Sequence, residues 1–268
     1  MAQLFIVDDK GITLNSQTLV ESGLGTSIAV SSDVKTMYIA SSALPYIRKY
    51  VNKSKTPEDS KTHEWTLDEE SFKNPIGVSQ YPSGLLLDGE HLLITLNESN
   101  NGNTTSKILK VNAVSGSQYV SAETGMYSSE IYSSTGEGLT AMVVHNNYLY
   151  VLNTGENNTG RSINKIALNS SDKHVGWVKD LDLSPIQLSI YENYLCVLTC
   201  GYLQPADKKV LLINLQNAKI AHSYEIANSS SAHLGLSLVD SLLNIIDEKG
   251  VNLYSSDLSA AVPVLTSV

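Results

Sequence analysis

The chain has few cysteines, and their spacing argues against a disulfide. Cys196 and Cys200 are its only two cysteines, and they stand four residues apart in one extended stretch. Residues at that spacing in a strand lie about 13 Å apart, too far for a disulfide. No disulfide framework is therefore expected, and nothing in the cysteines demands an oxidising compartment.

Clustered positive charge and long apolar runs are also lacking. The formal net charge is −9 with no basic run, which excludes nucleic acid as an expected partner. No apolar run approaches the roughly 20 residues that cross a bilayer. The N-terminus meets the carboxylates Asp8 and Asp9 after four apolar residues and has no leading positive charge, unlike a signal peptide. We expect a soluble protein without membrane insertion, in the cytoplasm or in a virion.

Proline is scarce, while serine and asparagine are abundant. Seven prolines beside 17 glycines exclude a collagen-like or proline-rich chain, and 42% hydrophobic residues exclude wholesale disorder. Serine and asparagine together supply about a fifth of the residues, well above ordinary usage. The length of 268 residues suits one large all-β domain.

The two ends of the chain carry the clearest internal repeat. Residues 4–14 match residues 243–253 almost step for step, from Leu4 and Leu243 onward. Each segment has the pattern of a strand, a tight Asp-x-Lys-Gly turn and a second strand, with glycine suited to the positive φ of a hairpin turn.

The first half of this unit recurs four more times, at 37–41, 93–97, 149–153 and 195–199. Mostly apolar residues are followed by a polar residue that starts a turn. Because successive strand residues point to opposite faces, these strands should be covered on both faces. Another strand precedes most of them and a third follows. A fourth, more polar strand often carries an aromatic residue: Trp65, Tyr119, Trp177 and Tyr224.

The second strands end at positions 8, 41, 97, 153, 199 and 247, so the units recur at intervals of 33 to 56 residues. Four-stranded units at such intervals, without helical periodicity, resemble the blades of the β-propeller superfamily. The resemblance covers nearly the whole chain but carries no subfamily motif. It predicts an all-β propeller of six blades in a single domain, residues 1–268. A two-sandwich protein is the competing fold.

The termini should close this ring. Residues 3–8 are expected to pair with the segment 243–267, within one blade or across one blade boundary. The first unit lacks its innermost strand, so residues 263–267 either fill that place or form the outer strand of the last blade.

Equivalent polar residues end the second strands: Asp8, Ser41, Asn97, Asn153, Thr199 and Asp247. In a closed ring they would surround one channel mouth, and carboxylate and amide oxygens are ligands that Ca²⁺ takes. The arrangement is similar to that by which some six-bladed propeller lactonases hold a divalent cation. Asp8, Asn97, Asn153 and Asp247 are the metal candidates. The competing interpretation is that such residues bond to the following turn backbone, with no cofactor.

Long polar loops offer a different site. Segments 97–105, 121–138, 153–161 and 200–208 are expected on one face, where loops on a rigid scaffold often bind partners. Tyrosine gives a large contact area with a polar tip. The binding candidates are Asn101, Tyr127, Tyr132, Asn157 and Tyr202.

Other catalytic signals are weak, because the six histidines are scattered and no nucleophile elbow, zinc motif or phosphate loop is present. Two functions remain open. The first is a non-catalytic binding or scaffold protein for a protein or glycan partner, in an assembly such as a phage or virus particle, whose proteins the composition resembles. The second is a divalent-metal-dependent lactone or ester hydrolase. The ligand, the source and the oligomeric state are not defined by the sequence.

Overall fold

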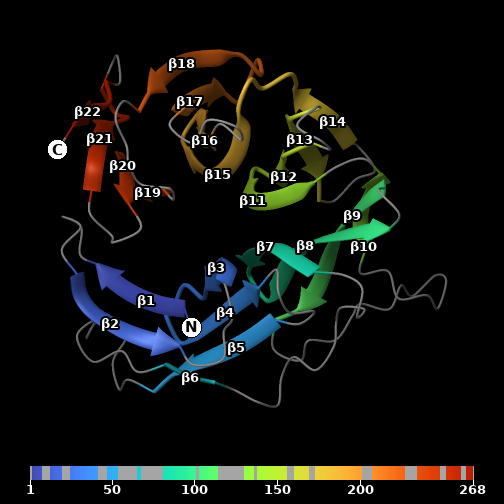
Figure 1. The fold of residues 1–268 in the computed structure, drawn as a ribbon, viewed down its shortest axis with the longest axis vertical. Coiled ribbons are helices and arrows are strands. Elements are labelled where there is room, and N and C mark those ends of the chain that lie inside the picture. Colours follow the sequence, from blue (N-terminus) through green and yellow to red (C-terminus); the bar gives the residue numbers. More distant parts are fainter. Residues whose placement is uncertain are drawn as a thin grey trace. The chain divides into compact units, whose positions relative to one another are not determined.

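A computed structural model describes most of the chain (Figure 1). The described residues are 2–7, 13–19, 25–41, 47–53, 65–67, 81–100, 103–113, 130–135, 138–155, 160–168, 173–200, 207–226, 234–247, 252–260 and 264–267. Within these ranges the regular elements are strands, with no helix, and therefore no helix capable of crossing a membrane.

Packing divides the chain into two compact units. Unit 1 contains residues 1–6 and 14–142, and unit 2 contains residues 7–13 and 143–268. The prediction of a single domain over residues 1–268 stays a prediction.

Unit 1 begins with a two-stranded sheet of β1 (Ala2–Val7) and β2 (Thr13–Leu19). Two four-stranded sheets follow, each in chain order. The first is formed by β3 (Gly25–Val30), β4 (Thr36–Ser41), β5 (Ile47–Asn52) and β6 (Trp65–Leu67). The second is formed by β7 (Tyr81–Asp88), β8 (His91–Asn100), β9 (Asn103–Asn112) and β10 (Glu130–Thr135).

Three more four-stranded sheets follow, also in chain order. The first has β11 (Leu139–His145), β12 (Tyr148–Asn153), β13 (Ser162–Ala167) and β14 (Lys173–Val178). The next has β15 (Ser184–Tyr191), β16 (Tyr194–Cys200), β17 (Lys208–Asn214) and β18 (Ile220–Glu225). The last has β19 (Leu234–Val239), β20 (Leu242–Asp247), β21 (Asn252–Asp257) and β22 (Thr266–Ser267).

Successive four-stranded antiparallel meanders without helices form a β-propeller, so the predicted fold class is confirmed. The prediction of six blades is wrong in one respect. Five sheets have four strands, whereas β1 and β2 form a sheet of only two among the described residues. The repeat in the sequence located every second strand, and the predicted lack of an innermost strand in the first repeat agrees with the two-stranded sheet of β1 and β2.

The chain termini do not share a sheet. β1 pairs with β2, whereas β22 pairs with β21 as the fourth strand of the last sheet. Pairing of residues 3–8 with 243–267 within one blade is therefore wrong, and their adjacency across a blade boundary stays a prediction. Of the two places predicted for residues 263–267, the outer strand of the last blade is the observed one.

The second and third strands supply most of the core, as the apolar runs predicted. Ile39, Val151, Val197 and Ile245, at equivalent positions of four second strands, are at most 5% exposed. Ile6 is the fifth residue at this position, on β1. The structure does not describe the side chains of β1, so burial of Ile6 stays a prediction. Aliphatic strands covered on both faces therefore form the interior of the blades.

Short turns join the first and second strands of most blades. In four of them the first turn residue has a positive φ: Gly89 (57°), Asn146 (50°), Glu192 (47°) and Asp240 (51°). A tight hairpin requires this conformation, which glycine, asparagine and aspartate adopt most readily. The φ of Glu192 is thus forced by the hairpin on a residue with no such preference.

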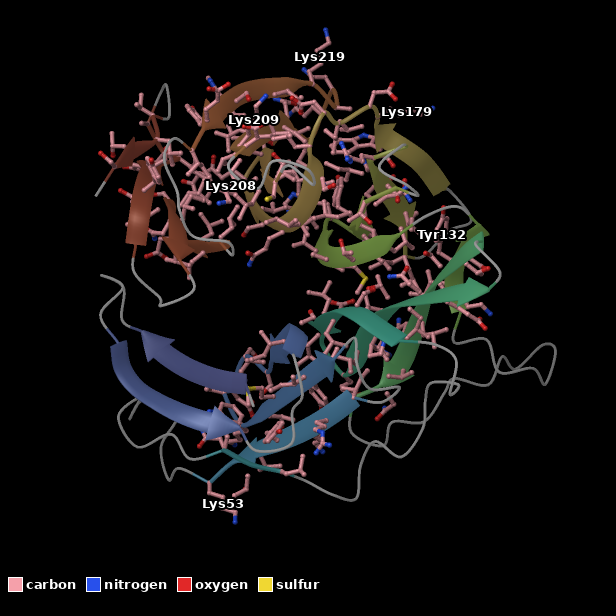
Figure 2. All side chains as sticks on the ribbon, viewed as in Figure 1. Lys53, Tyr132, Lys179, Lys208, Lys209 and Lys219 are labelled. Carbon is pink, nitrogen blue, oxygen red and sulfur yellow. The ribbon has the colours of Figure 1, made fainter. Side chains whose placement is uncertain are left out.

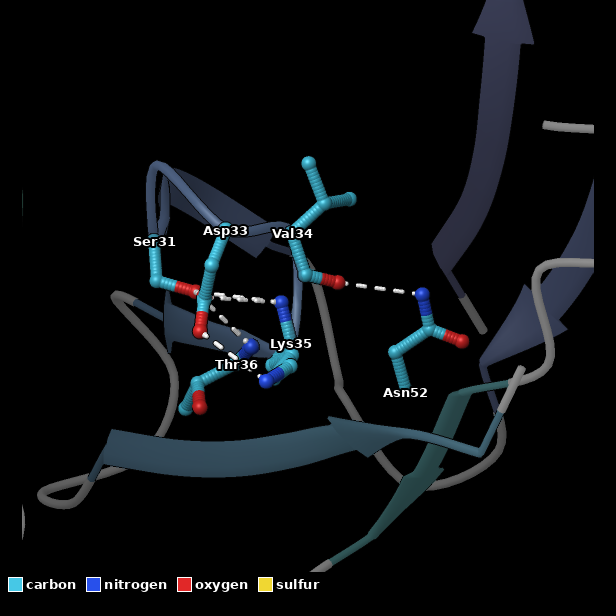
Figure 3. Close-up of polar contacts among 6 residues, drawn as sticks. All are labelled: Ser31, Asp33, Val34, Lys35, Thr36 and Asn52. Carbon is cyan, nitrogen blue, oxygen red and sulfur yellow. Dashed lines mark hydrogen bonds and ion pairs between the residues drawn. The ribbon is translucent and has the colours of Figure 1, made fainter. Parts of the chain in front are cut away.

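The turn between β3 and β4 is longer and is held by side chains (Figure 3). The Ser31 hydroxyl donates to the Asp33 carboxylate over 2.6 Å and accepts from the Thr36 amide over 2.9 Å. The Lys35 amide also donates to Asp33, over 3.1 Å. The hydrogen bonds from Ser31 and from the Lys35 amide lower the pKa of Asp33, because they favour its ionised form.

Candidate functional site

The predicted strand-end residues do lie near the ends of the second strands, but one of them is out of step. Positions are counted here from the last residue of the turn that joins the first and second strands, called the inner turn. Four of the residues stand six positions after it, and Asn97 stands seven positions after Glu90. The four are Ser41 (counted from Lys35), Asn153 (from Asn147), Thr199 (from Asn193) and Asp247 (from Ser241). Because side chains alternate between faces, Asn97 lies on the opposite face from the others. The predicted equivalence of Asn97 is wrong, and Asp8 is outside the described residues.

The Asn97 side chain is fully occupied by hydrogen bonds. Its amide nitrogen donates to the Ser83 hydroxyl (2.8 Å) and to the Leu139 carbonyl oxygen (2.7 Å). Its oxygen accepts from the Ser106 hydroxyl (2.6 Å) and from the Leu139 amide (3.1 Å). A carboxamide has two donors and two lone pairs, so all four positions are used.

Asn153 and Thr199 also bond to the protein itself. The Asn153 oxygen accepts from the Gly155 amide over 2.8 Å, and its nitrogen donates to the Ser162 hydroxyl over 3.1 Å. The Thr199 hydroxyl donates to the Lys209 carbonyl oxygen over 3.2 Å. These side chains hold the start of the turn between the second and third strands, as asparagine commonly does.

These bonds do not fit a calcium site made from the predicted ring. The Asn97 and Asn153 oxygens already accept hydrogen bonds, and Asn97 points away from the remaining members. The Asp247 side chain is outside the described ones. Within the described part of the chain, no three His, Cys, Asp or Glu residues gather as metal ligands would. The described strand-end residues Asn97, Asn153 and Thr199 therefore make structural hydrogen bonds. Metal binding by Asp8 and Asp247 stays a prediction.

The same part of three blades carries a repeated contact that the sequence did not reveal. β-Bulges interrupt three first strands, between Gly25 and Ser27, between Pro82 and Gly84, and between Pro185 and Gln187. A bulge redirects a side chain from its regular place in the strand. Each bulge is followed or filled by a residue that hydrogen-bonds the next sheet: Ser27, Ser83 and Gln187.

The partners of these residues are backbone groups of the next first strand. The Ser27 hydroxyl accepts from the Leu85 amide over 2.9 Å, and the Ser83 hydroxyl donates to the Leu139 carbonyl oxygen over 2.7 Å. Gln187 donates to the Leu236 carbonyl oxygen over 3.0 Å and accepts from the Leu236 amide over 2.7 Å. First strands are edge strands, and neighbouring side chains thus satisfy part of their free backbone.

Close packing accompanies these bonds at Gly84. A Cβ atom at this position would lie 2.0 Å from the Thr140 carbonyl oxygen and 2.7 Å from the Thr95 hydroxyl. The Thr95 hydroxyl itself donates to that carbonyl oxygen over 2.9 Å. Only glycine allows β7 and β11 to approach this closely, a role that the sequence did not suggest.

The predicted loop residues are distributed differently from expectation. β8 and β9 pair as far as Asn100 with Asn103, which leaves a two-residue connection, Asn101-Gly102, in place of the predicted loop 97–105. Asn-Gly is the strongest short-range hairpin signal, and it was present in the sequence. Asn101, Tyr127, Asn157 and Tyr202 lie outside the described residues.

The segment 121–138 is not a single loop at the end of the sheet that residues 97–105 occupy, contrary to prediction, because it contains β10. β9 finishes beside the Gly89 turn, since Asn112 pairs with His91, and β10 starts opposite Leu109. The connection containing Tyr127 therefore leaves and returns at the end opposite Asn101. Tyr132 belongs to β10 and is only 4% exposed, so its prediction as a loop residue is wrong (Figure 2). It occupies the fourth-strand aromatic place predicted for Tyr119.

An aromatic cluster around Lys165 was also missed. The Lys165 ammonium lies 4.2 Å from the centre of the Tyr148 ring and 5.6 Å from the rings of Tyr150 and Trp177. Tyr150 and Trp177 meet edge to face at 5.2 Å. The cluster joins β12, β13 and β14 by cation–π contacts, so it stabilises this sheet.

Neither cysteine forms a disulfide, as predicted. Cys196 is fully buried, and burial raises the pKa of its thiol to about 12. A thiol held neutral is a poor nucleophile. Cys196 fills the core in the place that Tyr150 holds in the preceding sheet.

Comparison with known proteins identifies a fold and no family. No protein-family model matches the chain, and no curated protein matches it in sequence. Hydrazine synthase from Kuenenia stuttgartiensis aligns with 91% of this chain and 65% of its own chain, at 12% identity and a TM-score of 0.58. The chain thus spans less than two thirds of that protein.

Two further solved structures are similar. The periplasmic gluconolactonase PpgL of Pseudomonas aeruginosa aligns with 99% of this chain and 77% of its own, at 11% identity and a TM-score of 0.56. A candidate 6-phosphogluconolactonase from Bacteroides uniformis aligns with 96% and 73%, at 11% identity and a TM-score of 0.53. At such identities the likeness supports the propeller fold and nothing finer.

Proposed function

We propose that the chain is a non-catalytic binding or scaffold propeller that engages a protein or glycan partner. The observation that supports this most is the complete hydrogen bonding of Asn97, joined by the bonds of Asn153 and Thr199. Polar side chains that already hydrogen-bond turns and neighbouring sheets are not available to coordinate a metal ion. A rigid scaffold of this kind leaves recognition to its loops.

The binding loops in this proposal are 153–161 and 200–208, with Asn157 and Tyr202 as contact residues, together with the Asn101 turn. All three connections join a second strand to a third, so they leave their own sheets at corresponding ends. Tyr127 is not included, because β9 ends and β10 begins toward the Gly89 end of their sheet. Tyr132 is not included because it is buried in β10.

The experiment compares loop variants for retention of a partner. A glycan array and an extract of the source cells supply the two partner classes. Asn157→Ala and Tyr202→Ala should lose retention, while Tyr191→Ala, at the opposite end of its sheet, should keep it. Equal retention by all three variants would refute the loop assignment.

The alternative is a divalent-metal-dependent lactone or ester hydrolase. The specific observation in its favour is the fold shared with a gluconolactonase. This hypothesis requires stoichiometric Ca²⁺ and predicts that Asp8→Asn and Asp247→Asn abolish lactone hydrolysis. Calorimetric titration of the purified protein with Ca²⁺, followed by a lactonase assay, separates the two functions. The scaffold proposal would be overturned if the parent protein bound Ca²⁺ and hydrolysed a lactone and both variants had lost these properties.

Membership of a phage or virus particle is a further part of the scaffold proposal. It is supported by the acidic composition, rich in serine and asparagine, and by the low cysteine content. Co-sedimentation of the chain with intact particles from its source is the test, and its absence from purified particles would contradict the proposal.

A further inference from the structure

An apolar residue on β3, the first strand of the first four-stranded sheet, is exposed where its counterparts in other sheets are buried. Ile28 on β3 pairs with Ile39, the fourth residue after the inner turn. The residues that pair with the same position in three other sheets are Leu85, Leu188 and Leu236. These three are 6%, 8% and 6% exposed, whereas Ile28 is 47% exposed.

The buried counterparts are covered by the preceding sheet. Leu85 shares a core cluster with Ala29, Tyr38 and Ala40 of the sheet before it. Leu236 likewise packs in a cluster with Cys196 and Leu198. The same inter-sheet interface is thus established at two places in the chain, and it covers this position with the inner strands of the preceding blade.

A hydrogen bond belongs to that interface. The Leu85 amide donates to Ser27, and the Leu236 amide donates to Gln187, each on the first strand of the preceding sheet. The Ile28 amide stands at the equivalent place. To make the same hydrogen bond, it would need a polar acceptor on the first strand of a sheet before β3.

The sheet before β3 lacks that strand. Residues 4–14 match residues 243–253, so β1 corresponds to the second strand β20 and β2 to the third strand β21. Among the described strands, β1 pairs only with β2. No described strand therefore occupies the edge of β1 where a first strand would pair. Ile28 and Val30, the latter 43% exposed, lie on β3, the strand that such a first strand would cover.

We propose that an extended segment of another polypeptide adds to β1 as the missing innermost strand. It would pair antiparallel with β1, cover Ile28 and Val30 with apolar or small side chains, and accept the Ile28 amide with a serine, asparagine or glutamine. The chain's own first strands are six to eight residues long, which sets the length of the segment. Strand addition of this kind takes affinity from backbone bonds and specificity from alternate side chains.

A single extended chain fits this place better than a second folded copy. Neighbouring strands in a sheet lie about 4.8 Å apart. The occupant must bond to the edge of β1 and also lie over the face of β3, and one strand meets both requirements. This surface differs from the loops 153–161 and 200–208, so the result bears on it independently of the proposed function.

The probe is a fluorescent peptide of residues 184–191, the chain's own β15, which carries the Gln187 that bonds the next sheet. A peptide of residues 220–225, from an outermost strand, is the control. We expect saturable binding of the first peptide alone, with a Kd below about 1 mM. Ile28→Asp should weaken it by at least about tenfold.

Ile220→Asp is the matched protein variant, because Ile220 is 48% exposed on β18. It should bind the peptide as the parent does. Equal binding of the two peptides or equal effects of the two variants would overturn the proposal. So would a dimer by light scattering that Ile28→Asp dissociates, since a second copy would then be the occupant.

A covalent version guards against weak affinity. Residues 184–191 are fused ahead of Met1 through an Asn-Gly turn, so that the added strand can fold back on β1. The fusion should raise Tm by at least about 2 °C, and Ile28→Asp should remove that gain. A fusion with unchanged Tm, together with no peptide binding, would refute the added strand.

Discussion

The side chain of Asn97 bonds to both backbone groups of Leu139, donating to its carbonyl oxygen over 2.7 Å and accepting from its amide over 3.1 Å. Gln187 makes the same pair of bonds to Leu236. In both cases a carboxamide pairs with the next sheet as another strand would.

Asn97→Asp should therefore destabilise the protein strongly. The carboxylate cannot donate to Ser83 or to the Leu139 carbonyl oxygen, and it would be repelled by that oxygen. We expect a loss of about 2–3 kcal/mol in the free energy of unfolding, measured by urea denaturation. Asn217→Asp is the control, because the Asn217 oxygen accepts from the Lys219 amide, which a carboxylate can also do. Similar losses in both variants would contradict the paired role of Asn97.

Gly84→Ala should be at least as costly. The added Cβ would stand 2.0 Å from the Thr140 carbonyl oxygen, so β7 and β11 would have to separate. We expect a loss of about 3 kcal/mol or more, read from thermal or urea unfolding. Gly89→Asn tests the same residue type in open space, at a φ of 57° that asparagine tolerates, and should change little. A mild effect at Gly84 would mean that the two strands can move apart freely.

Glu192→Asn should stabilise the protein. Glu192 has a φ of 47°, and Asn146 already occupies the equivalent place in the preceding sheet. Asparagine adopts this conformation at lower cost, so the gain should be about 0.5–1 kcal/mol in the free energy of unfolding. Glu90→Asn, in the second position of a corresponding turn, is the control and should give no gain. A loss at Glu192 would show that its side chain matters more than its backbone.

Val151→Ala should cost about 1–3 kcal/mol through lost apolar burial and the cavity left behind. Val151 is 0% exposed, whereas Val264 is 59% exposed. The same substitution at Val264 should therefore have almost no effect. Denaturant unfolding of both variants checks the contrast, which disappears if the β12 face is open to water in solution.

The ion pair of Asp182 and Lys209 gives a pH dependence of known sign. The Lys209 ammonium lies 2.8 Å from the Asp182 carboxylate, and its hydrogen bond lowers the pKa of that carboxyl. A lowered pKa means that the unfolded chain binds the proton more readily. The stabilisation is present above the ordinary aspartate value and is lost as the pH falls through the lowered pKa.

Asp182→Asn should therefore cost less than about 1 kcal/mol at pH 7, because the pair is largely exposed. The difference from the parent should close as the pH falls below about 4, and it should shrink in about 1 M NaCl. Urea unfolding across pH checks both. A difference that grows on acidification would have the wrong sign for this pair.

The sequence predicted the blades well because their second strands are apolar on both faces. Burial of Val151, Val197 and Ile245 follows directly from that pattern. The same pattern misaligned Asn97, since β8 carries one more residue before its polar end and the repeat was aligned on polarity. The inner turn at Gly89 and Glu90 gives the correct register.

The contacts between blades could not be read from the sequence. The bulges at Ser27, Ser83 and Gln187 depend on how neighbouring sheets approach, which no local pattern encodes. Gly84 looks like any strand glycine until β11 is placed beside it. The two-residue turn at Asn101 and Gly102 was predictable from Asn-Gly, but its polar neighbours suggested a longer loop.

The carboxamide pairs of Asn97 and Gln187 also bear on how the protein unfolds. In a repeat protein, stability is the sum of each repeat and its interfaces with its neighbours. Asn97 lies in the sheet of β7–β10 and Gln187 in the sheet of β15–β18, and each bonds the backbone of the sheet that follows or lies beside its own. A sheet that opens therefore releases bonds on its neighbour as well. Adjacent blades tied in this way should open together, and hydrogen exchange should find protection extending over pairs of blades rather than ending at each one.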